Sequence, residues 1–592
     1  MKGVLVGGLL FVGMGAVFWV FGWSIGNYVT GPSSGGKAKP NPIPPVDSSG
    51  GPYYRGAVAA DAKNCSAIGV NILKRKGSAV DAAIATMLCV GVINMHSTGV
   101  GGGGFMLVYN KTSNTTEAID FREKAPVAAN ESMFVDKVRD AKFGGLAVGV
   151  PGEVRGYYKA WEKYGRLRWR DIVQPAIDIA KNGFYIGKPV HDAASELKDE
   201  IINNPGLREL LFKTDGKTLK DRDSPITNLK YAATLKTIRD NPHSFYNGTL
   251  ARNIIRDIQF MEPQGIMGLD DLKNYTAEIR KGLSGRLGPN LVMHTVPPPA
   301  SGAVMHLLLD ILKGYNFTES SRDLKDTNTS TLTYHRITEA SKFAFAWRSR
   351  LADPAFDGSV EKYVEKMLDQ STADYLRAQI WDNQTHDNVS YYANYFSYED
   401  HGTSHLAVLA PNGDAVSLTS SINLRFGNQH RSTTTGIIYN DQMSDFDNPG
   451  SKRHAGLSPS ELNFPAPGKR PFSSMTPVII TDNNGNVKMV FGASGGKQII
   501  TATSQAIMNK LWFGRSLKQS IEDLRIHTQL IPDDFLYHEA NFPRDILDGL
   551  RNLGHDLKEL KHYAAVQGIV RETRGEIYAW SDSRKSGKPG GF

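Results

Sequence analysis

Long runs of basic residues are absent from this chain of 592 residues, although its net charge is +8 and its pI is about 9.0. Its 68 Lys and Arg residues are spread along the sequence, whereas nucleic-acid-binding proteins concentrate them in a run or on one face. We therefore expect no nucleic-acid partner. Hydrophobic residues make up 40% and charged residues 22%, which excludes a largely disordered chain. The length suffices for a large core.

Cysteine is also scarce, because Cys65 and Cys89 are the only two in the sequence. Each lies twelve residues from Gly77, and the apolar spacing predicts helices over 60–76 and 79–92. An antiparallel helical hairpin that turns at Gly77 brings the two sulfurs side by side. An oxidising compartment then favours a disulfide, and a pair of buried, inert thiols is the alternative.

Charge is missing from residues 3–25, which are dominated by Val, Leu, Gly, Phe and Trp. A helix of about 20 apolar residues crosses a bilayer, whereas the apolar core of a secretory signal spans roughly 7–15. We interpret residues 4–25 as a transmembrane signal-anchor after a short cytoplasmic tail, since Lys2 puts positive charge on the short side. A cleaved signal peptide is the alternative, although no small-x-small site is obvious after Trp23. Residues 26–53 are rich in Pro, Gly and Ser and are predicted to form an extracellular stalk.

Asn-x-Ser/Thr tripeptides agree with an extracellular location, because they accept glycans in secreted proteins. None lies after Asn388, so the C-terminal third is expected to be more buried or differently used. The candidates are Asn110, Asn114, Asn130, Asn247, Asn274, Asn316, Asn328, Asn383 and Asn388, and Asn64 carries the same tripeptide.

Two glycine-rich segments are similar to nucleotide-binding loops, and both fail on closer comparison. Residues 99–104 match G-x-G-x-x-G, but a predicted helix precedes them and a predicted strand over 105–109 follows, which reverses the dinucleotide-binding order. Residues 492–498 lack the first Gly and the final Ser or Thr of a P-loop. What remains is Gly495-Gly496 at the start of a predicted helix, where backbone N–H groups favour an anion or an oxyanion.

A predicted hairpin turns at Asn412-Gly413, because apolar-rich runs flank this strong signal for a two-residue turn. That turn places Thr403 opposite Ile422, with Ser421 and Asn423 on either side. Gly402 and Thr403 then open a strand. Taken alone, these polar groups are typical of the edge of a β-hairpin and indicate no function.

Arg122 stands where another predicted strand ends, a common place for a ligand-facing group, and a surface salt bridge is the alternative. Residues 436–446 are predicted to be a strand that ends in a polar loop. The region from about 150 to 390 is interpreted as a mainly helical scaffold, with helices over about 153–164, 170–183 and 303–314.

Six motifs in sequence order resemble those of the γ-glutamyltransferases, or glutathione hydrolases, from about residue 53 to the C-terminus. The resemblance implies an α+β fold, the four-layer αββα sandwich of the N-terminal-nucleophile hydrolases. The anchor, stalk and helical-hairpin disulfide resemble the animal cell-surface members, which implies a single-pass type II plasma-membrane protein with its catalytic domain outside. The motifs are DFRE at 120–123, GTSHL at 402–406, DQMSDF at 441–446, PFSSM at 471–475, GASGGKQ at 492–498 and SDSRKSG at 581–587.

Members of that family are made as a precursor that cuts itself, and the resemblance places the cut between Gly402 and Thr403. The heavy chain would contribute 54–402 and the light chain 403–592, as a heterodimer. Cleavage would free the Thr403 α-amine, whose reference pKa is about 7.7–8.0, to act as general base for the Thr403 hydroxyl. No metal or cofactor is implied.

The resemblance also implies a γ-glutamyl substrate such as glutathione, with the acyl group released to water or to an amino acid or dipeptide. Gln442 replaces a Glu of some relatives, and Ser421 stands where Thr is frequent. The implied roles are α-carboxylate binding by Arg122, Ser473 and Ser474, ammonium binding by Asp445, Gln442 and Asn423, an oxyanion hole at Gly495 and Gly496, and orientation of the Thr403 hydroxyl by Ser421.

Two other functions stay open on the sequence alone. One is a related acylase or amidase that acts on a different acyl group. The other is a catalytically silent cell-surface scaffold, although every motif residue is present.

Overall fold

The computed structural model describes residues 46–592 except 320–322, 393–394, 397–401, 452–456 and 532–533. The predicted tail and signal-anchor, residues 1–25, lie outside the described residues, as does most of the predicted stalk. Within the described ranges, no helix is both long and apolar enough to cross a membrane. Tyr53, which the sequence places at the end of the stalk, pairs with Ile577 and is buried. The folded body therefore begins before residue 54.

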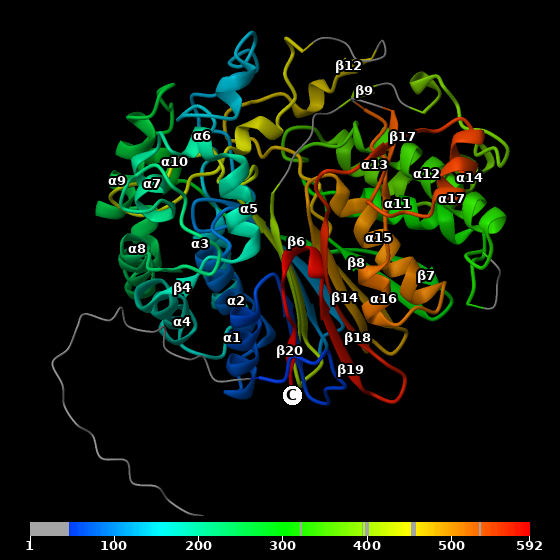
Figure 1. The fold of residues 1–592 in the computed structure, drawn as a ribbon, viewed down its shortest axis with the longest axis horizontal. Helices are drawn as coiled ribbons and strands as arrows, with labels where there is room; N and C mark the ends of the chain where they lie inside the picture. The colour runs from blue at the N-terminus through cyan, green and yellow to red at the C-terminus, as the bar shows by residue number, and fades with distance from the viewer. Residues whose placement is uncertain (1–45, 320–322, 393–394, 397–401, 452–456, 532–533) are drawn as a thin grey trace, which may run out of the picture. The chain divides into compact units, whose positions relative to one another are not determined.

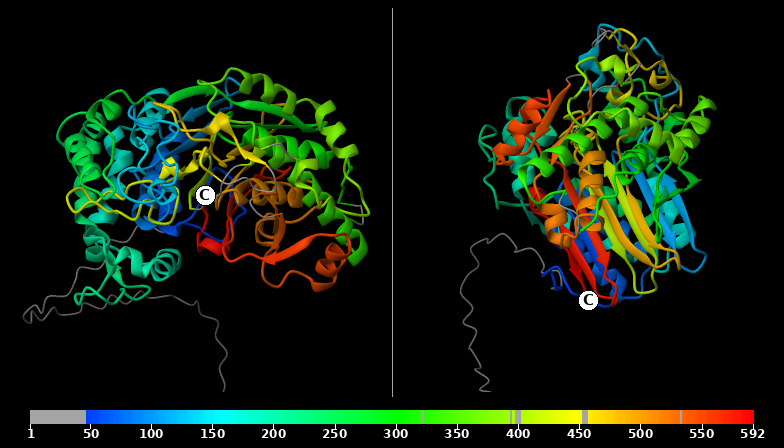
Figure 2. Two further views of the ribbon diagram at one scale, coloured as in Figure 1. Left: turned by 90° about the horizontal axis from the view of Figure 1, so that it is seen from above. Right: turned by 90° about the vertical axis from the view of Figure 1, so that its right-hand side faces the viewer.

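Two antiparallel sheets, packed face to face, form the centre of the described chain (Figures 1 and 2). Apolar side chains such as Phe105 and Leu409 from the first sheet meet Ile479 and Val490 from the second. In order across the first sheet, the strands are β20 (Gly590–Gly591), β1 (Ala57–Ala60), β10 (Ser404–Leu409), β11 (Ala415–Ser421), β2 (Gly103–Asn110), β3 (Thr115–Asp120) and β6 (Glu278–Lys281). The second sheet consists of β19 (Ile577–Ser581), β18 (Ala565–Arg571), β14 (Val487–Ser494), β13 (Val478–Asp482), β8 (Leu291–Thr295) and β7 (Leu283–Gly288).

Helices cover the outer face of each sheet, which gives the predicted four-layer αββα arrangement (Figure 1). The first sheet is covered by α1 (Lys63–Lys74), α2 (Ala79–Ile93), α3 (Glu153–Tyr164), α4 (Trp169–Asn182), α5 (Lys188–Glu196), α6 (Lys198–Ile201), α7 (Pro205–Leu211), α8 (Leu229–Asp240), α9 (Thr249–Gln259) and α10 (Leu269–Lys273), which share one core with it. The core of the second sheet includes α11 (Gly302–Lys313), α12 (Thr327–Arg348), α13 (Ser359–Met367), α14 (Gln370–Ala378), α15 (Gln498–Leu511), α16 (Leu517–Glu522) and α17 (Arg544–Asn552).

Three small sheets complete the strands of the described chain. They are β15 (Ile526–His527) with β16 (Phe535–His538) and β17 (Asp556–Glu559), β12 (Ser458–Pro459) with β9 (Tyr395–Phe396), and β4 (Phe184–Tyr185) with β5 (Pro225–Ile226).

The predicted helical hairpin is formed by α1 and α2. Ser78 caps α2 in a capping box with Asp81, since the Asp81 N–H donates to Ser78 Oγ at 3.0 Å and the Ser78 N–H donates back to the Asp81 carboxylate at 2.9 Å. Such a cap contributes about 1 kcal/mol. Cys65 and Cys89 form a disulfide between the two helices, as predicted.

The turn between β10 and β11 differs from the prediction by one residue. Leu409 pairs with Ala415, and the Ala410 N–H donates to the Asp414 carbonyl at 2.9 Å, so the loop consists of the three residues 411–413. A two-residue turn would pair Pro411 with Asp414, but proline has no N–H to donate to the ladder. The register therefore shifts, and Thr403 lies opposite Ser421 rather than Ile422.

Residues 436–440 form no strand, which is a second correction. Ile438 makes only an isolated bridge to Arg431. The backbone and side-chain amides of Asn440 both donate to the carbonyl of Gly101, at 3.3 and 2.7 Å. A Cβ at Gly101 would lie 2.1 Å from the carbonyl oxygen of Ile438. The segment is therefore ordered by close contact with the 99–104 glycines and by backbone hydrogen bonds to residues 428–432, and it forms no regular strand.

Strands from before and after residue 402 alternate in the first sheet. β10 and β11 lie between β1 and β2, and the carbonyl of Phe592 accepts a hydrogen bond from the Arg55 N–H at 2.8 Å. Cleavage at residue 402 would thus leave the two fragments joined by ladder hydrogen bonds and a common core.

The Asn side chains of the predicted glycosylation sites are exposed, with the exception of the half-buried Asn110 at the end of β2.

Candidate active site

The Gly402-Thr403 peptide lies at the start of β10, beside the turn that connects β14 to α15. The carbonyl oxygen of Gly402 accepts a hydrogen bond from the Gly495 N–H at 3.1 Å. The Thr403 hydroxyl donates to Ser421 Oγ at 3.2 Å, and Ser421 Oγ also accepts the Asn423 N–H at 2.8 Å. Thr403 is only 5% exposed. The hydroxyl, the neighbouring carbonyl and one of the two glycines predicted for an oxyanion therefore meet at this bond.

The backbone at this bond is strained. Gly402 has φ +125°, and a Cβ there would lie 1.7 Å from the carbonyl oxygen of Asn423, so only glycine fits. Thr403 has φ +92°, which is unfavourable for a β-branched residue. Conformations of this kind cost on the order of 1–3 kcal/mol. The surrounding contacts hold the peptide in this state.

Lys585, which lies within SDSRKSG but has no predicted role, contacts the peptide group that follows Thr403. Its ammonium group donates to the carbonyl oxygen of Thr403 and forms an ion pair with Asp61 at 2.8 Å. Ser494 Oγ lies 3.3 Å from the same nitrogen. Lys585 thus places a fixed positive charge beside Thr403.

A second group of predicted residues is built around Arg122. Its guanidinium forms an ion pair with Asp445, and its Nε donates to the carbonyl of Pro471 at 3.1 Å. Gln442 Nε2 donates to the same Asp445 carboxylate at 2.6 Å. The Arg122 and Asp445 side chains are 1% and 3% exposed, so the alternative of a surface salt bridge is wrong.

The remaining predicted residues surround these two groups. Asn423 Nδ2 donates to Ser444 Oγ at 2.8 Å, which ties the neighbourhood of Thr403 to the loop of Asp445. Ser473 Oγ accepts the Met475 N–H at 3.2 Å, and Ser474 Oγ accepts from Arg348 at 3.0 Å. These serines follow Pro471, which Arg122 contacts.

Gly496 completes the predicted oxyanion pair. It is buried, has φ +61°, and its carbonyl accepts the Ile499 N–H at 3.0 Å at the start of α15. The described contact with Gly402 is made by Gly495.

Glu123, the next residue after Arg122, has a fully buried carboxyl group close to the Arg122 guanidinium. Its Oε2 lies 3.6 Å from Arg122 Nη1, and neither carboxyl oxygen has a hydrogen-bond partner within the described part of the chain. Burial raises the pKa of Glu123 to about 8, against the opposing charge of Arg122. Glu123 is therefore largely uncharged at neutral pH, which leaves Asp445 as the charged partner of Arg122.

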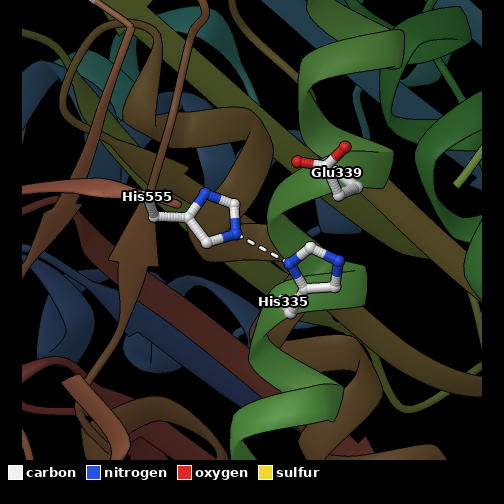
Figure 3. Close-up of side chains that lie close together, drawn as sticks. All are labelled: His335, Glu339 and His555. Atoms are coloured by element: carbon white, nitrogen blue, oxygen red, sulfur yellow. Dashed lines mark hydrogen bonds between the residues drawn. The ribbon is translucent and has the colours of Figure 1, made fainter. Parts of the chain in front are cut away.

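A separate cluster of possible metal ligands lies on α12, where His335 and Glu339 approach His555 (Figure 3). The described contacts account for these groups by hydrogen bonding. His335 Nδ1 lies 2.8 Å from His555 Nε2, while its other nitrogen lies 2.7 Å from the Trp381 carbonyl. Both Glu339 oxygens accept hydroxyl hydrogen bonds, at 2.7 and 2.5 Å. Burial lowers the pKa of His555 to about 2, so His555 is uncharged, and we interpret the cluster as a structural link.

Comparison with known proteins identifies the family. The profile described as Gamma-glutamyltranspeptidase matches residues 65–592. The chain belongs to the γ-glutamyltranspeptidase family. Scoloptoxin SSD14 of Scolopendra dehaani is 39% identical over 544 residues, which covers 91% of this chain and 93% of that protein. Glutathione hydrolase 2 of Arabidopsis thaliana is 38% identical over 559 residues, with 91% and 94% covered.

Solved structures agree with the γ-glutamyltranspeptidase assignment. Helicobacter pylori gamma-glutamyltranspeptidase is 28% identical with a TM-score of 0.50, and the match covers 55% of this chain and 91% of that one. Cephalosporin acylase from Bacillus halodurans has a TM-score of 0.76 at 24% identity, over 91% of this chain and 96% of that one. The second likeness supports the predicted N-terminal-nucleophile hydrolase fold.

The buried Glu123 gives this γ-glutamyltranspeptidase a testable pH dependence. Because its folded-state pKa of about 8 lies above the ordinary value of 4.5, the folded protein keeps a proton that the unfolded chain releases as pH rises between them. Its contribution to stability therefore decreases with rising pH across that window. We expect Glu123→Gln, which is uncharged at every pH, to reduce the fall in unfolding temperature between about pH 5 and 8.

Thermal unfolding at several pH values in this window measures the effect, with Glu131→Gln, at an exposed position, as the control. Equal pH slopes for the wild type and Glu123→Gln would contradict the buried neutral carboxyl.

Proposed function

We propose that this protein cleaves γ-glutamyl bonds through a γ-glutamyl-Thr403 ester, and that it forms its nucleophile by cutting itself between Gly402 and Thr403. The observation that carries this proposal is the bond itself, with the Thr403 hydroxyl beside it and its carbonyl on the Gly495 N–H. The glutathione hydrolase relatives support the γ-glutamyl substrate, and two of those in fission yeast and one in rat are named proenzymes.

Self-cleavage begins with attack of Thr403 Oγ on the carbonyl carbon of Gly402. The Gly495 N–H stabilises the oxyanion that forms, and collapse breaks the C–N bond to give an ester, with the hydroxyl proton passing to the departing Thr403 nitrogen. Water then hydrolyses the ester and leaves residues 54–402 as the heavy-chain part and residues 403–592 as the light-chain part of one heterodimer. Breaking the bond also releases the strain at φ of Thr403, which favours cleavage.

The free α-amine of Thr403 then acts as general base for its own hydroxyl. Lys585 lies against the carbonyl of the same residue, and its positive charge disfavours protonation of the amine. Ser421 orients the hydroxyl, and Gly495 with Gly496 stabilises the oxyanion of the substrate. The acyl group passes to water in hydrolysis, or to the amine of an amino acid or dipeptide in transfer.

The opposed charges of Arg122 and Asp445 match the head of a γ-glutamyl group. Its α-carbon carries a carboxylate and an ammonium, and the two protein charges lie within ion-pair distance of each other. Arg122 binds the α-carboxylate bidentately, with Ser473 and Ser474 adding hydrogen bonds. Asp445 binds the ammonium, with Gln442 and Asn423 supporting it.

The proposal extends to location. Residues 4–25 serve as a signal-anchor of a type II plasma-membrane protein, similar to the animal cell-surface members, with the exposed Asn-x-Ser/Thr sites on the outside. Support comes from the uncharged run of about 20 residues and from Lys2 before it. The full chain is expected to remain with membranes after alkaline carbonate extraction, and recovery in the supernatant would contradict the anchor.

Replacement of Arg122 tests the substrate class. Arg122→Lys keeps the charge but loses the bidentate geometry, and hydrogen bonds between charged groups contribute about 1.5–3 kcal/mol. We therefore expect KM for γ-glutamyl-4-nitroanilide to rise about 10- to 100-fold. Arg350→Lys, at an exposed position, is the matched control.

A donor that lacks only the α-carboxylate, 4-aminobutyryl-4-nitroanilide, separates this function from a related amidase. The wild type should turn it over poorly. Equal turnover of both anilides, together with an unchanged KM in Arg122→Lys, would instead identify an acylase that recognises another group.

A further inference from the structure

A cavity of about 380 Å³ opens beside the Gly402-Thr403 peptide and is lined by both residues and by Gly495. Small-molecule sites typically have volumes of roughly 300–1,000 Å³. Neither Arg122 nor Asp445 lines this cavity. If those two residues hold the acyl half of a γ-glutamyl compound, the cavity is the space that remains for the other half, the amine that leaves or attacks.

Most charged side chains in the cavity wall already have partners of their own. Lys585 is paired with Asp61 at 2.8 Å, and Arg584 is paired with acidic side chains beneath the surface. Lys188 pairs with Asp192 one turn along α5. Lys585 and Arg584 are therefore largely neutralised within the fold, whereas the Lys188 pair is exposed on the surface of α5.

Arg425 belongs to a different, exposed group in the wall. Its guanidinium pairs with Glu196, and its Nη2 lies 3.0 Å from His562 Nδ1. His562 Nε2 lies 3.1 Å from the same Glu196 carboxylate. The three side chains are 29%, 46% and 48% exposed for Arg425, Glu196 and His562. Exposed ion pairs contribute about 0–1 kcal/mol, so a ligand carboxylate can replace Glu196 on Arg425.

Lys561 adds a positive charge next to this group. It is exposed, lines the cavity, and makes no ion pair within the described part of the chain. Carboxylate binding at Arg425 would therefore also benefit from the Lys561 charge.

The segment that carries His562 is packed against the oxyanion glycine. Gln498, the first residue of α15, donates to the His562 carbonyl at 3.1 Å and accepts the Ala564 N–H at 3.1 Å. A Cβ at Gly495 would lie 2.8 Å from Cα of Ala564. The Arg425 group is therefore fixed relative to the site where the substrate carbonyl reacts.

We propose that this cavity is the amine-side subsite of the reaction, and that Arg425, with His562 and Lys561, binds the α-carboxylate of the amino acid or short peptide there. The proposal rests on the γ-glutamyl function above and adds which leaving groups and acceptors the site selects. They are amines that carry a free carboxylate.

In the transfer step, the bound amine nitrogen attacks the carbonyl carbon of the γ-glutamyl ester. A C–N bond forms and the C–Oγ bond to Thr403 breaks. The proton of the attacking amine passes to the Thr403 α-amine and then to the departing Oγ. Cleavage of the donor is the reverse of this step, because it breaks a C–N bond and forms the C–Oγ bond to Thr403. One subsite therefore serves both the leaving and the attacking amine.

Acceptor kinetics test the subsite, with γ-glutamyl-4-nitroanilide as donor and either glycylglycine or glycylglycinamide as acceptor. The measured quantity is the KM for glycylglycine divided by the KM for glycylglycinamide, because only glycylglycine carries the carboxylate. We expect Arg425→Met to raise this ratio about tenfold, equivalent to about 1.4 kcal/mol. Glu196→Gln removes the competing carboxylate and should lower the ratio. Arg350→Met, at an exposed position that does not line the cavity, is the matched control and should leave the ratio unchanged.

Self-cleavage of each variant, seen on a denaturing gel, shows that it has folded. An unchanged ratio in both Arg425→Met and Glu196→Gln, with intact cleavage and donor turnover, would overturn the subsite. Failure of the wild type to turn over the donor would instead overturn the proposed function.

Discussion

The hydrogen bond from the Gly495 N–H to the Gly402 carbonyl is the interaction on which the geometry of the strained Gly402-Thr403 peptide depends. It fixes a carbonyl next to the hydroxyl of the following residue, in a backbone conformation that glycine tolerates and threonine resists. The positive φ of Thr403 exists only while the peptide is intact. Cleavage therefore removes the unfavourable conformation and leaves the contacts that oriented the hydroxyl. The N–H that would stabilise the precursor's oxyanion is then available to a substrate.

The two sheets explain why the site could survive such a cut. β10 starts at the scissile bond, yet it is hydrogen-bonded to β1 on one side and β11 on the other. The buried charged groups around Arg122 are balanced in a similar way, because each charge has a partner within the fold. Arg122 is neutralised by Asp445 while burial keeps Glu123 protonated, so a buried cation faces one carboxylate rather than two. A ligand with a carboxylate and an ammonium can satisfy both charges at once.

Periodicity predicted the scaffold helices and the helical hairpin of the disulfide, and the family motifs predicted the two groups of site residues. The strands β6, β7 and β8, which lie within the region interpreted as a helical scaffold, were missed. Features that depend on contacts distant in sequence were not predictable. The hairpin register changed because Pro411 cannot donate to the ladder, and residues 436–440 bond to a glycine loop more than 300 positions away. Lys585 belonged to a recognised motif, but its position beside Thr403 follows only from the tertiary fold. The carboxylate-binding group at Arg425 has no local sequence pattern, since its members come from three separate segments.

Mass spectrometry of the small fragment identifies both the cleaved bond and the nucleophile in one experiment. The purified protein is briefly mixed with a γ-glutamyl donor, quenched in acid, and digested. We expect a fragment whose first residue is Thr403 and a γ-glutamyl ester on that residue. An uncut chain, a fragment that begins elsewhere, or an adduct on another side chain would contradict this expectation.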